Sequence, residues 1–369
     1  MRCTRMGAGG DFLLVNLKTF ARERAASHPG LFDPQNFPSD LFREMGDAGL
    51  LGAVDLGTIA RGNALIASET GSLGFATAWT EQSMIPLVLE KRAGLPSEVK
   101  AGVKSGETIL ALAVSEPKAG AHPKYLSTTA TRVQGGWNLD GEKAYVTSGP
   151  IASHVAVLAI TDTSGGRKSF SFFLVPTDAK GLSQINHPQF DFLRPAQHCG
   201  FRLEGCTVPE SALIGRPGKG YEDIAGPFRN LEDAVLTGGI IGVLARAGRR
   251  TARALGPNIS EEQALFLGEM AGIEAALEAL DTPVVKALEA WDTDTDAVEI
   301  RLVAIRDLAR RCTEILHTIG TGGDEHVDRI LWDVEKSLDI ARTARQIRKA
   351  RLGRSYFISI KDFSGKEPE

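Results

Sequence analysis

Residues 113–123 have the sequence AVSEPKAGAHP, in which an apolar run stops at Ser115-Glu116-Pro117 and the chain turns through Gly120 to a second proline. The preceding residues, TILALAV, predict a β-strand, because apolar residues recur there without a helical period. Proline and glycine then predict that the strand ends abruptly in small, hydrogen-bonding residues. The segments before and after this strand end show which fold it belongs to.

The chain changes its pattern twice. From about residue 12 to 104 the apolar residues recur at helical spacing, and from 108 to about 215 short β-rich runs are separated by Gly-Gly, Asp-Gly and Ser-Gly-Gly turns. Asp140-Gly141 predicts a hairpin within an antiparallel β unit. After Gly220 four long helical segments predict a four-helix bundle, the last of them DRILWDVEKSLDIARTARQIRKARLG. The sequence therefore predicts an α+β fold with three domains, 1–107 (helical), 108–217 (β) and 218–369 (helical bundle).

Composition excludes several classes of protein. The 369 residues are 43% hydrophobic and 24% charged, as is usual for a soluble globular protein, and the net charge of −4 argues against nucleic acid as the main partner. The N-terminal apolar run is too short for a signal peptide or a membrane span. Four scattered cysteines favour a reducing cytoplasm, and the histidines lack the spacing of a metal site. We expect a cytoplasmic protein without a metal ion.

Five segments in order carry a resemblance to a known family: AVSEPKAGAHP, GGWNLDGEKAYVTSG, SFFLVPTDAKGL, LEGCTVPESALIGRPGKGY and EDAVLTGGIIG. Together they resemble the acyl-CoA dehydrogenase family of flavoproteins over nearly the whole chain, although the family's P-E-x-Y-G-G loop is absent between Gly52 and Gly74. The resemblance implies an oxidoreductase with FAD as cofactor and an acyl-CoA as substrate. It also implies an electron-transfer flavoprotein as a possible electron acceptor, and either a homotetramer or a hetero-oligomer with a paralogue.

The resemblance also implies which residues bind FAD. The flavin is a flat apolar ring with a polar edge, so its site needs backbone groups and small side chains at strand ends. The implied residues in this chain are Val114, Ser115, Gly120, Ala121, Tyr145 and Thr147, with Gly320, Gly322 and Gly323 approaching the FAD of a neighbouring subunit. Ala121 stands where the family usually has a serine. The alternative is that Ser115 and Thr147 cap strands and Tyr145 packs in a core.

The catalytic base follows from the same resemblance. Most members carry it as a glutamate near the C-terminus, but here that position is Arg342, which stays protonated and cannot act as a base. A minority branch, which includes the isovaleryl-CoA dehydrogenases, has its glutamate in an L-E-R-x-x-x-x-G-G run. LEDAVLTGG matches this run and places the candidate base at Glu232. Asp233 replaces an arginine that contacts CoA, and we expect it to repel phosphate.

Two functions remain open from the sequence. The first is an FAD-dependent acyl-CoA dehydrogenase that uses Glu232 as its base. The second is a catalytically degenerate subunit that contributes structure, or part of a cofactor site, to a hetero-oligomer. The basic residues from Arg342 to Arg354 spread over more than one helix face, which indicates a solvated charge run rather than a binding site.

Overall fold

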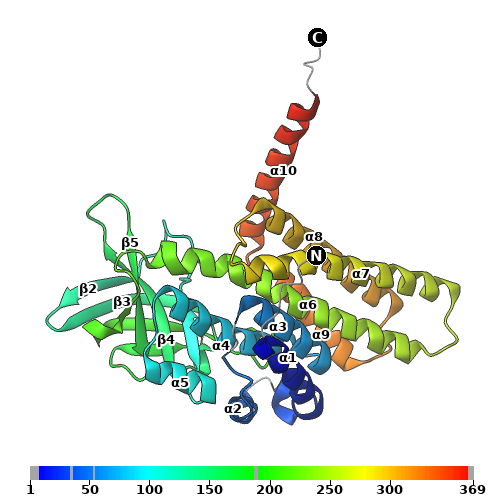
Figure 1. The fold of residues 1–369 in the computed structure, drawn as a ribbon, viewed down its shortest axis with the longest axis horizontal. Coiled ribbons are helices and arrows are strands. Elements are labelled where there is room, and N and C mark those ends of the chain that lie inside the picture. Colours follow the sequence, from blue (N-terminus) through cyan, green and yellow to red (C-terminus); the bar gives the residue numbers. More distant parts are fainter. Residues whose placement is uncertain (1–7, 34–35, 53–54, 187–189, 365–369) are drawn as a thin grey trace.

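The computed structural model describes residues 8–33, 36–52, 55–186 and 190–364. The first helices are α1 (Ala8–Phe20), α2 (Ser39–Asp47), α3 (Leu56–Thr70), α4 (Leu73–Arg92) and α5 (Ser97–Ser105). Helix α4 is buried on nearly every side, because it lies between the sheet and the C-terminal helices (Figure 1). Helix α4 therefore packs against the N-terminal helices, the sheet and the C-terminal helices.

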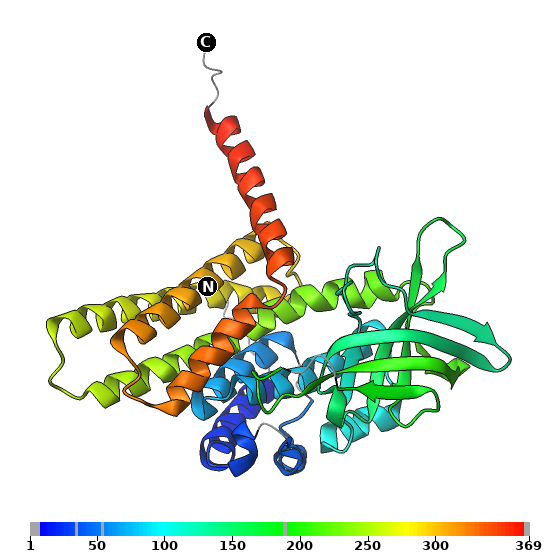
Figure 2. The same ribbon diagram turned by 180° about the vertical axis from the view of Figure 1, so that it is seen from behind.

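The middle of the chain forms one eight-stranded sheet, with seven strands in the order β6-β7-β3-β2-β4-β5-β8 and β1 paired with β4. The strands are β1 (Leu110–Ala113), β2 (Thr129–Val133), β3 (Gly136–Thr147), β4 (His154–Asp162), β5 (Ser169–Pro176), β6 (Leu182–Ile185), β7 (His198–Pro209) and β8 (Leu213–Ile214). Figure 2 shows this sheet at one end of the molecule, beside the helices. The observed helices and sheet confirm the predicted α+β fold.

Two details of the predicted β unit are wrong. Strand β4 pairs in parallel with β1 and β2, so the sheet is mixed rather than antiparallel throughout. Asp140-Gly141 is not a hairpin, because β3 continues through it with a register shift between Leu139 and Gly141. Gly141 has φ +145°, a conformation that glycine tolerates and that bends a strand at a bulge. The turn instead lies between Val133 and Gly136.

The C-terminal part contains α6 (Gly226–Leu255), α7 (Glu261–Glu289), α8 (Asp296–Ile319), α9 (Glu325–Asp339) and α10 (Arg342–Ser364). The predicted fourth helix of the bundle is therefore two helices. The break falls at Ala341, whose φ of +54° ends the helical path without a glycine or proline in the sequence. Helix α10 consequently turns away and projects from the body of the molecule (Figures 1 and 2).

Glycines set the position of α6 against α3. A Cβ atom added at Gly238 would lie 2.9 Å from the carbonyl oxygen of Ala60, and one added at Gly242 would lie 2.2 Å from that of Ala64. Neither substitution fits, so the two helices pack backbone to backbone. Glu232 lies two turns before Gly239, so the two residues lie on the same face of α6. This face points inward, because a Cβ atom added at Gly239 would meet Asn63 of α3 and Leu73 of α4.

One hydrophobic core runs through most of the molecule. It contains apolar residues of α3, α4 and α6 to α9 together with one face of the sheet, so the helices and the sheet are held as one body. In the described ranges no helix has the length and apolar character needed to cross a membrane.

Candidate active site

The first motif forms a closed turn directly after β1. The N–H of Glu116 donates to the carbonyl oxygen of Gly120 at 3.0 Å, and the N–H of Gly120 donates back at 3.0 Å. Gly120 has φ +54°, and a Cβ atom there would meet no described atom within 4 Å. The carbonyl oxygen of Ser115 accepts from the N–H of Ala144 at 2.9 Å, which joins this turn to β3. The open space at Gly120 fits the approach of a ligand to the main chain.

The Glu116 side chain anchors this turn in the protein interior. Its carboxylate accepts from the N–H and hydroxyl of Ser127, each at 2.7 Å, and from the N–H of Thr128 at 2.9 Å. The ammonium of Lys143 completes the set with an ion pair of 3.0 Å. Both charged side chains are buried, so their contribution is structural: they hold the strand end while the adjacent backbone stays accessible.

Glu116→Gln should destabilise the protein by about 3 kcal/mol near neutral pH, because it leaves the Lys143 ammonium buried without a counterion. Burial raises the pKa of Glu116, but the Lys143 charge and the hydrogen bonds from Thr128 and Ser127 outweigh this and lower the pKa to about 2 from 4.5. The stabilisation is therefore complete above pH 4.5 and is lost as pH falls toward 2.

Urea unfolding at several pH values tests this prediction. Between pH 4.5 and 2 the parent should lose stability more steeply than Glu116→Gln, so the difference between them shrinks. The double variant Glu116→Leu/Lys143→Met is the matched control, because it removes both charges and should recover part of the loss. A difference that stays constant through acid would exclude the ion pair as its cause.

The second motif lies at the C-terminal end of β3, next to the residue that is joined to the turn of the first motif. Tyr145 sits in an irregularity of the strand with φ +61°, and its side chain is 48% exposed and stacked on Phe190 at 6.1 Å between ring centroids. The alternative in which Tyr145 packs in a core is therefore wrong. Thr147 pairs in register with His198 of β7, a residue that no sequence motif marks as part of a site. Burial and the charge of Arg194 lower the pKa of His198 to about 4.

The His198 ring places a buried polar atom on this part of the sheet. Its Nδ1 is buried and has no hydrogen-bond partner among the residues that the structure describes. Because Thr147 and His198 are paired neighbours, both side chains lie on the same face of the sheet. A polar ligand edge placed there would satisfy Nδ1, so this face fits the edge of a flavin. The open turn at Gly120, joined to β3 through Ala144, and the exposed ring of Tyr145 offer further groups that suit a flavin.

Hydrogen bonds tie the first motif and the segment before β7 to the helices. The hydroxyl of Tyr221, just before α6, donates to the carbonyl oxygen of Ala121 at 3.3 Å. The N–H of Leu193, in the segment before β7, donates to the Asp333 carboxylate of α9 at 2.9 Å. The strand ends are thereby fixed relative to α6 and α9, and the site lies where the sheet meets the bundle.

Glu232 is held on the inward face of α6 near α4. Its carboxyl group shares a hydrogen bond with the carboxyl group of Glu81, a residue of α4 that is only 4% exposed. Burial and the adjacent Asp233 raise the pKa of Glu232 to about 7, although the hydrogen bond with Glu81 and the charge of Arg345 act in the opposite direction. A carboxylate with a pKa near 7 is suited to take a proton at neutral pH.

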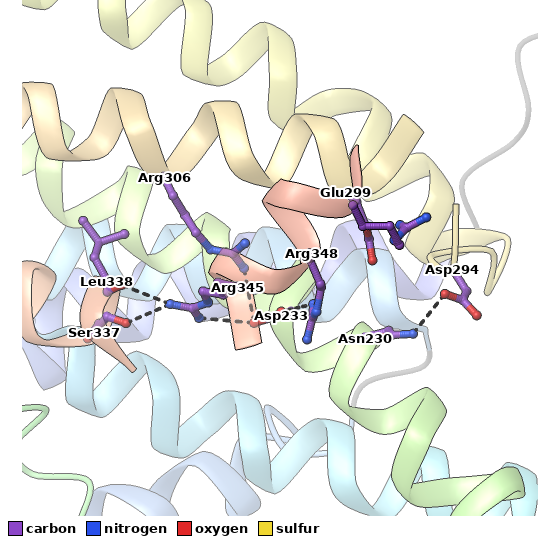
Figure 3. Close-up of polar contacts among 10 residues, drawn as sticks. Asn230, Asp233, Asp294, Glu299, Arg306, Ser337, Leu338, Arg345 and Arg348 are labelled. Atoms are coloured by element: carbon purple, nitrogen blue, oxygen red, sulfur yellow. Dashed lines mark hydrogen bonds and ion pairs between the residues drawn. The ribbon is translucent and has the colours of Figure 1, made fainter. Parts of the chain in front are cut away.

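Asp233, the next residue of α6, points into a cluster of arginines (Figure 3). It contacts Arg306 of α8 at 3.2 Å, and Arg345 and Arg348 of α10 at 3.2 and 2.8 Å. All four side chains are at most 21% exposed. Three cations surround one anion, so the expectation that Asp233 repels phosphate is wrong: the surroundings carry a net positive charge.

The same contacts correct the interpretation of the basic segment. Arg345 and Arg348 are not a solvated run, because both pair with Asp233, and Arg345 also donates to the carbonyl oxygens of Ser337 and Leu338 (Figure 3). Arg342, by contrast, is exposed, which agrees with its exclusion as a base. A pocket of about 400 Å³ lies between α8 and α10 beside these arginines.

The three glycines of the α8–α9 turn lie elsewhere. Gly320, Gly322 and Gly323 have φ between +64° and +82°, and an added Cβ at any of them would meet no described atom within 4 Å. Figure 2 shows this turn at the end of the bundle away from the sheet. The structure therefore does not bring them together with Tyr145 and Thr147 of the same chain. The described residues also contain no cluster of metal-ligating side chains.

Comparisons with known proteins agree with this arrangement. Residues 111–206 match the model of the acyl-CoA dehydrogenase middle domain. Isovaleryl-CoA dehydrogenase from Oryza sativa subsp. japonica is 30% identical over 92% of this chain and 88% of its own length. The 2-methylacyl-CoA dehydrogenase from Solanum tuberosum is 28% identical over 92% and 88%. The solved structure of butyryl-CoA dehydrogenase from Megasphaera elsdenii has a TM-score of 0.82 at 18% identity, covering 96% of this chain and 100% of that one.

These matches confirm the resemblance of the sequence motifs, and with it the predicted class of FAD-dependent oxidoreductases. The coverage includes the helices on both sides of the sheet, so it is not limited to the middle domain. The chain belongs to the acyl-CoA dehydrogenase family.

Proposed function

We propose that this protein is an FAD-dependent acyl-CoA dehydrogenase that removes the α-proton of an acyl-CoA thioester with Glu232. The observation that carries the proposal is the inward-facing carboxyl group of Glu232, whose pKa is raised to about 7 chiefly by burial. The similarity to isovaleryl-CoA dehydrogenases supports it, because that branch resembles this chain in the LEDAVLTGG segment.

Different residues of this chain have separate roles in the dehydrogenation. FAD, when bound, supplies the acceptor for the hydride that leaves the β-carbon. The ionised Glu232 carboxylate takes the α-proton and becomes a neutral carboxylic acid. Glu232 is half-buried on the inward face of α6, which limits the access of water to the base when it meets the substrate. The net positive arginine cluster around Asp233 favours the binding of the anionic CoA end of the substrate.

FAD would be held by the two motif turns. In this proposal Val114, Ser115 and Thr147 meet the polar edge of the flavin, Tyr145 covers its ring, and the Gly120-Ala121 turn allows close approach of the backbone. The exposed ring of Tyr145 and the open space at Gly120 support this arrangement. The absorbance spectrum of the purified protein tests it: a yellow protein with flavin bands is expected, and colourless protein that takes up no added FAD would refute it.

Gly120→Leu should lower the affinity for FAD at least ~10-fold, because the new side chain fills the open space at the turn. Gly94→Leu is the matched control: Gly94 also has a positive φ, of +78°, and equally open surroundings, but it follows α4 and lies outside both motifs. Both variants place leucine at a positive φ, so both carry backbone strain. Titration of the two apoproteins with FAD, followed by flavin fluorescence, measures the difference. Equal affinities would remove Gly120 from the cofactor site.

We further propose that the functional unit is an oligomer, most simply a homotetramer. The turn carrying Gly320, Gly322 and Gly323 lies away from the strand-end motifs of its own chain, which supports its use against the FAD of a neighbour. Light scattering should show a mass well above the 39.5 kDa of one chain. An electron-transfer flavoprotein as electron acceptor, a paralogue as partner and a cytoplasmic location remain proposals from the sequence, as do the domain boundaries after residues 107 and 217.

A degenerate subunit without its own catalysis is the competing function. Arg342 at the usual position of the base favours it, whereas the placement of Glu232 does not. Two results together would support the degenerate subunit. A paralogous chain would co-purify with this protein, and the FAD bound to this protein would never be reduced by an acyl-CoA.

A further inference from the structure

Glu81 is a buried acid that the proposed reaction does not use. It lies in the middle of α4 at 4% exposure, one residue before Gln82, whose amide donates to the carbonyl oxygen of Thr108. Its Oε1 has no hydrogen-bond partner among the described residues. A buried carboxyl group in a helix that packs on all sides is costly unless another group compensates for it. The group that does so is Glu232 on α6.

Two carboxyl groups that share a hydrogen bond cannot both be ionised, so one of them holds the proton. Charges around the pair decide which one. Glu232 lies near Arg345 of α10, which favours its ionised form, and beside Asp233 of its own helix, which opposes it. Glu81 has no cation among the groups that act on it, and burial, the charge of Glu232 and their hydrogen bond all raise its pKa well above the usual value.

We propose that Glu81 is a positioning residue for the base: as a neutral carboxylic acid it donates a hydrogen bond to the Glu232 carboxylate and fixes its orientation. This inference rests on the proposed function of Glu232. The donated O–H occupies one carboxylate oxygen, which leaves the other oxygen for the α-proton. It also stabilises the anion, so Glu232 is ionised at a lower pH than burial beside Asp233 alone would allow.

Removal of the donor tests the role of Glu81. In Glu81→Leu the acidic limb of the pH profile of flavin reduction should move up by about one pH unit, because Glu232 loses the bond that lowers its pKa. Glu81→Gln keeps an N–H donor of similar size and should restore the parent limb. A purely structural role for Glu81 would lower the rate or the stability without moving the limb. An unmoved limb in Glu81→Leu would therefore overturn the proposal.

Infrared spectroscopy locates the proton without any turnover. At pH 8.5 the FAD-loaded parent should keep a C=O stretching band of a protonated carboxyl group, which Glu81→Gln should lose. Asp281→Asn is the matched control: Asp281 is also a partly buried helical acid, but burial raises its pKa only to about 6, so it is ionised at pH 8.5. The control variant should keep the band.

The outcomes separate the two proposals. A parent without the band at pH 8.5, or a band that survives in Glu81→Gln, would show that Glu81 is not the protonated partner and would overturn the inference. A parent that has the band, but whose flavin is never reduced by an acyl-CoA, would instead refute the proposed dehydrogenase, and with it the role of Glu81 in catalysis.

Discussion

Glu232→Gln is expected to slow the reduction of bound flavin by an acyl-CoA at least ~100-fold, because the amide cannot take the α-proton. The change is nearly isosteric, and the amide can still accept a hydrogen bond from the Glu81 carboxyl group. Fold and FAD affinity should therefore be close to those of the parent. Single-turnover reduction, followed by the loss of flavin absorbance under anaerobic conditions, measures the step that Glu232 performs.

Glu278→Gln is the matched control for this variant. Glu278 lies on α7 with its side chain exposed, so the same chemical change there should leave the rate within about 2-fold of the parent. A Glu232→Gln protein that binds FAD and reduces it at the parent rate would remove Glu232 from the mechanism. Equal losses in both variants would point to a general effect on the fold.

Asp233→Asn should also destabilise the protein strongly, by about 3 kcal/mol in the free energy of unfolding. The carboxylate is 15% exposed and is the shared counterion of Arg306, Arg345 and Arg348. Its removal leaves three guanidinium groups close together in a partly buried site, where they repel one another. Since Arg345 and Arg348 are the contacts of α10 with α6, we also expect faster amide hydrogen exchange along the first turns of α10.

Asp307→Asn provides the comparison. Asp307 pairs with Lys349, and both side chains are more than half exposed, so the loss should be within 1 kcal/mol. Urea unfolding and hydrogen exchange of the two variants measure the difference. If Asp233→Asn unfolds at the same urea concentration as Asp307→Asn, the arginine cluster does not stabilise the packing of α10 on α6.

Local sequence patterns predicted the helices and strands well where local features of the sequence determine the structure. The abrupt end of β1, the β-rich middle and the long helices follow from periodicity and turn residues. The break at Ala341 could not be predicted, because the left-handed residue that causes it is an alanine without a flanking glycine or proline. Asp140-Gly141 misled for the opposite reason: the dipeptide favours a turn, but pairing of β3 with β7 on both sides keeps the strand continuous.

The residues of the candidate site were likewise only partly predictable from the sequence. Glu232 and the two motif turns could be found from the order of their residues, whereas their partners could not. Glu81 is more than a hundred residues from Glu232, and so is Asp233 from Arg345, so only the packing of α4 and α10 on α6 brings these groups together. The charge of Asp233 therefore appeared repulsive in the sequence, and its three arginine partners reverse that conclusion.

Anaerobic addition of acyl-CoA thioesters of different chain length and branching to the FAD-loaded protein tests the proposed dehydrogenation most directly. At least one thioester should abolish the flavin absorbance in the parent, and Glu232→Gln should slow this loss by at least ~100-fold. Bound flavin that keeps its absorbance with every thioester, short or long, straight or branched, would contradict the proposed dehydrogenation.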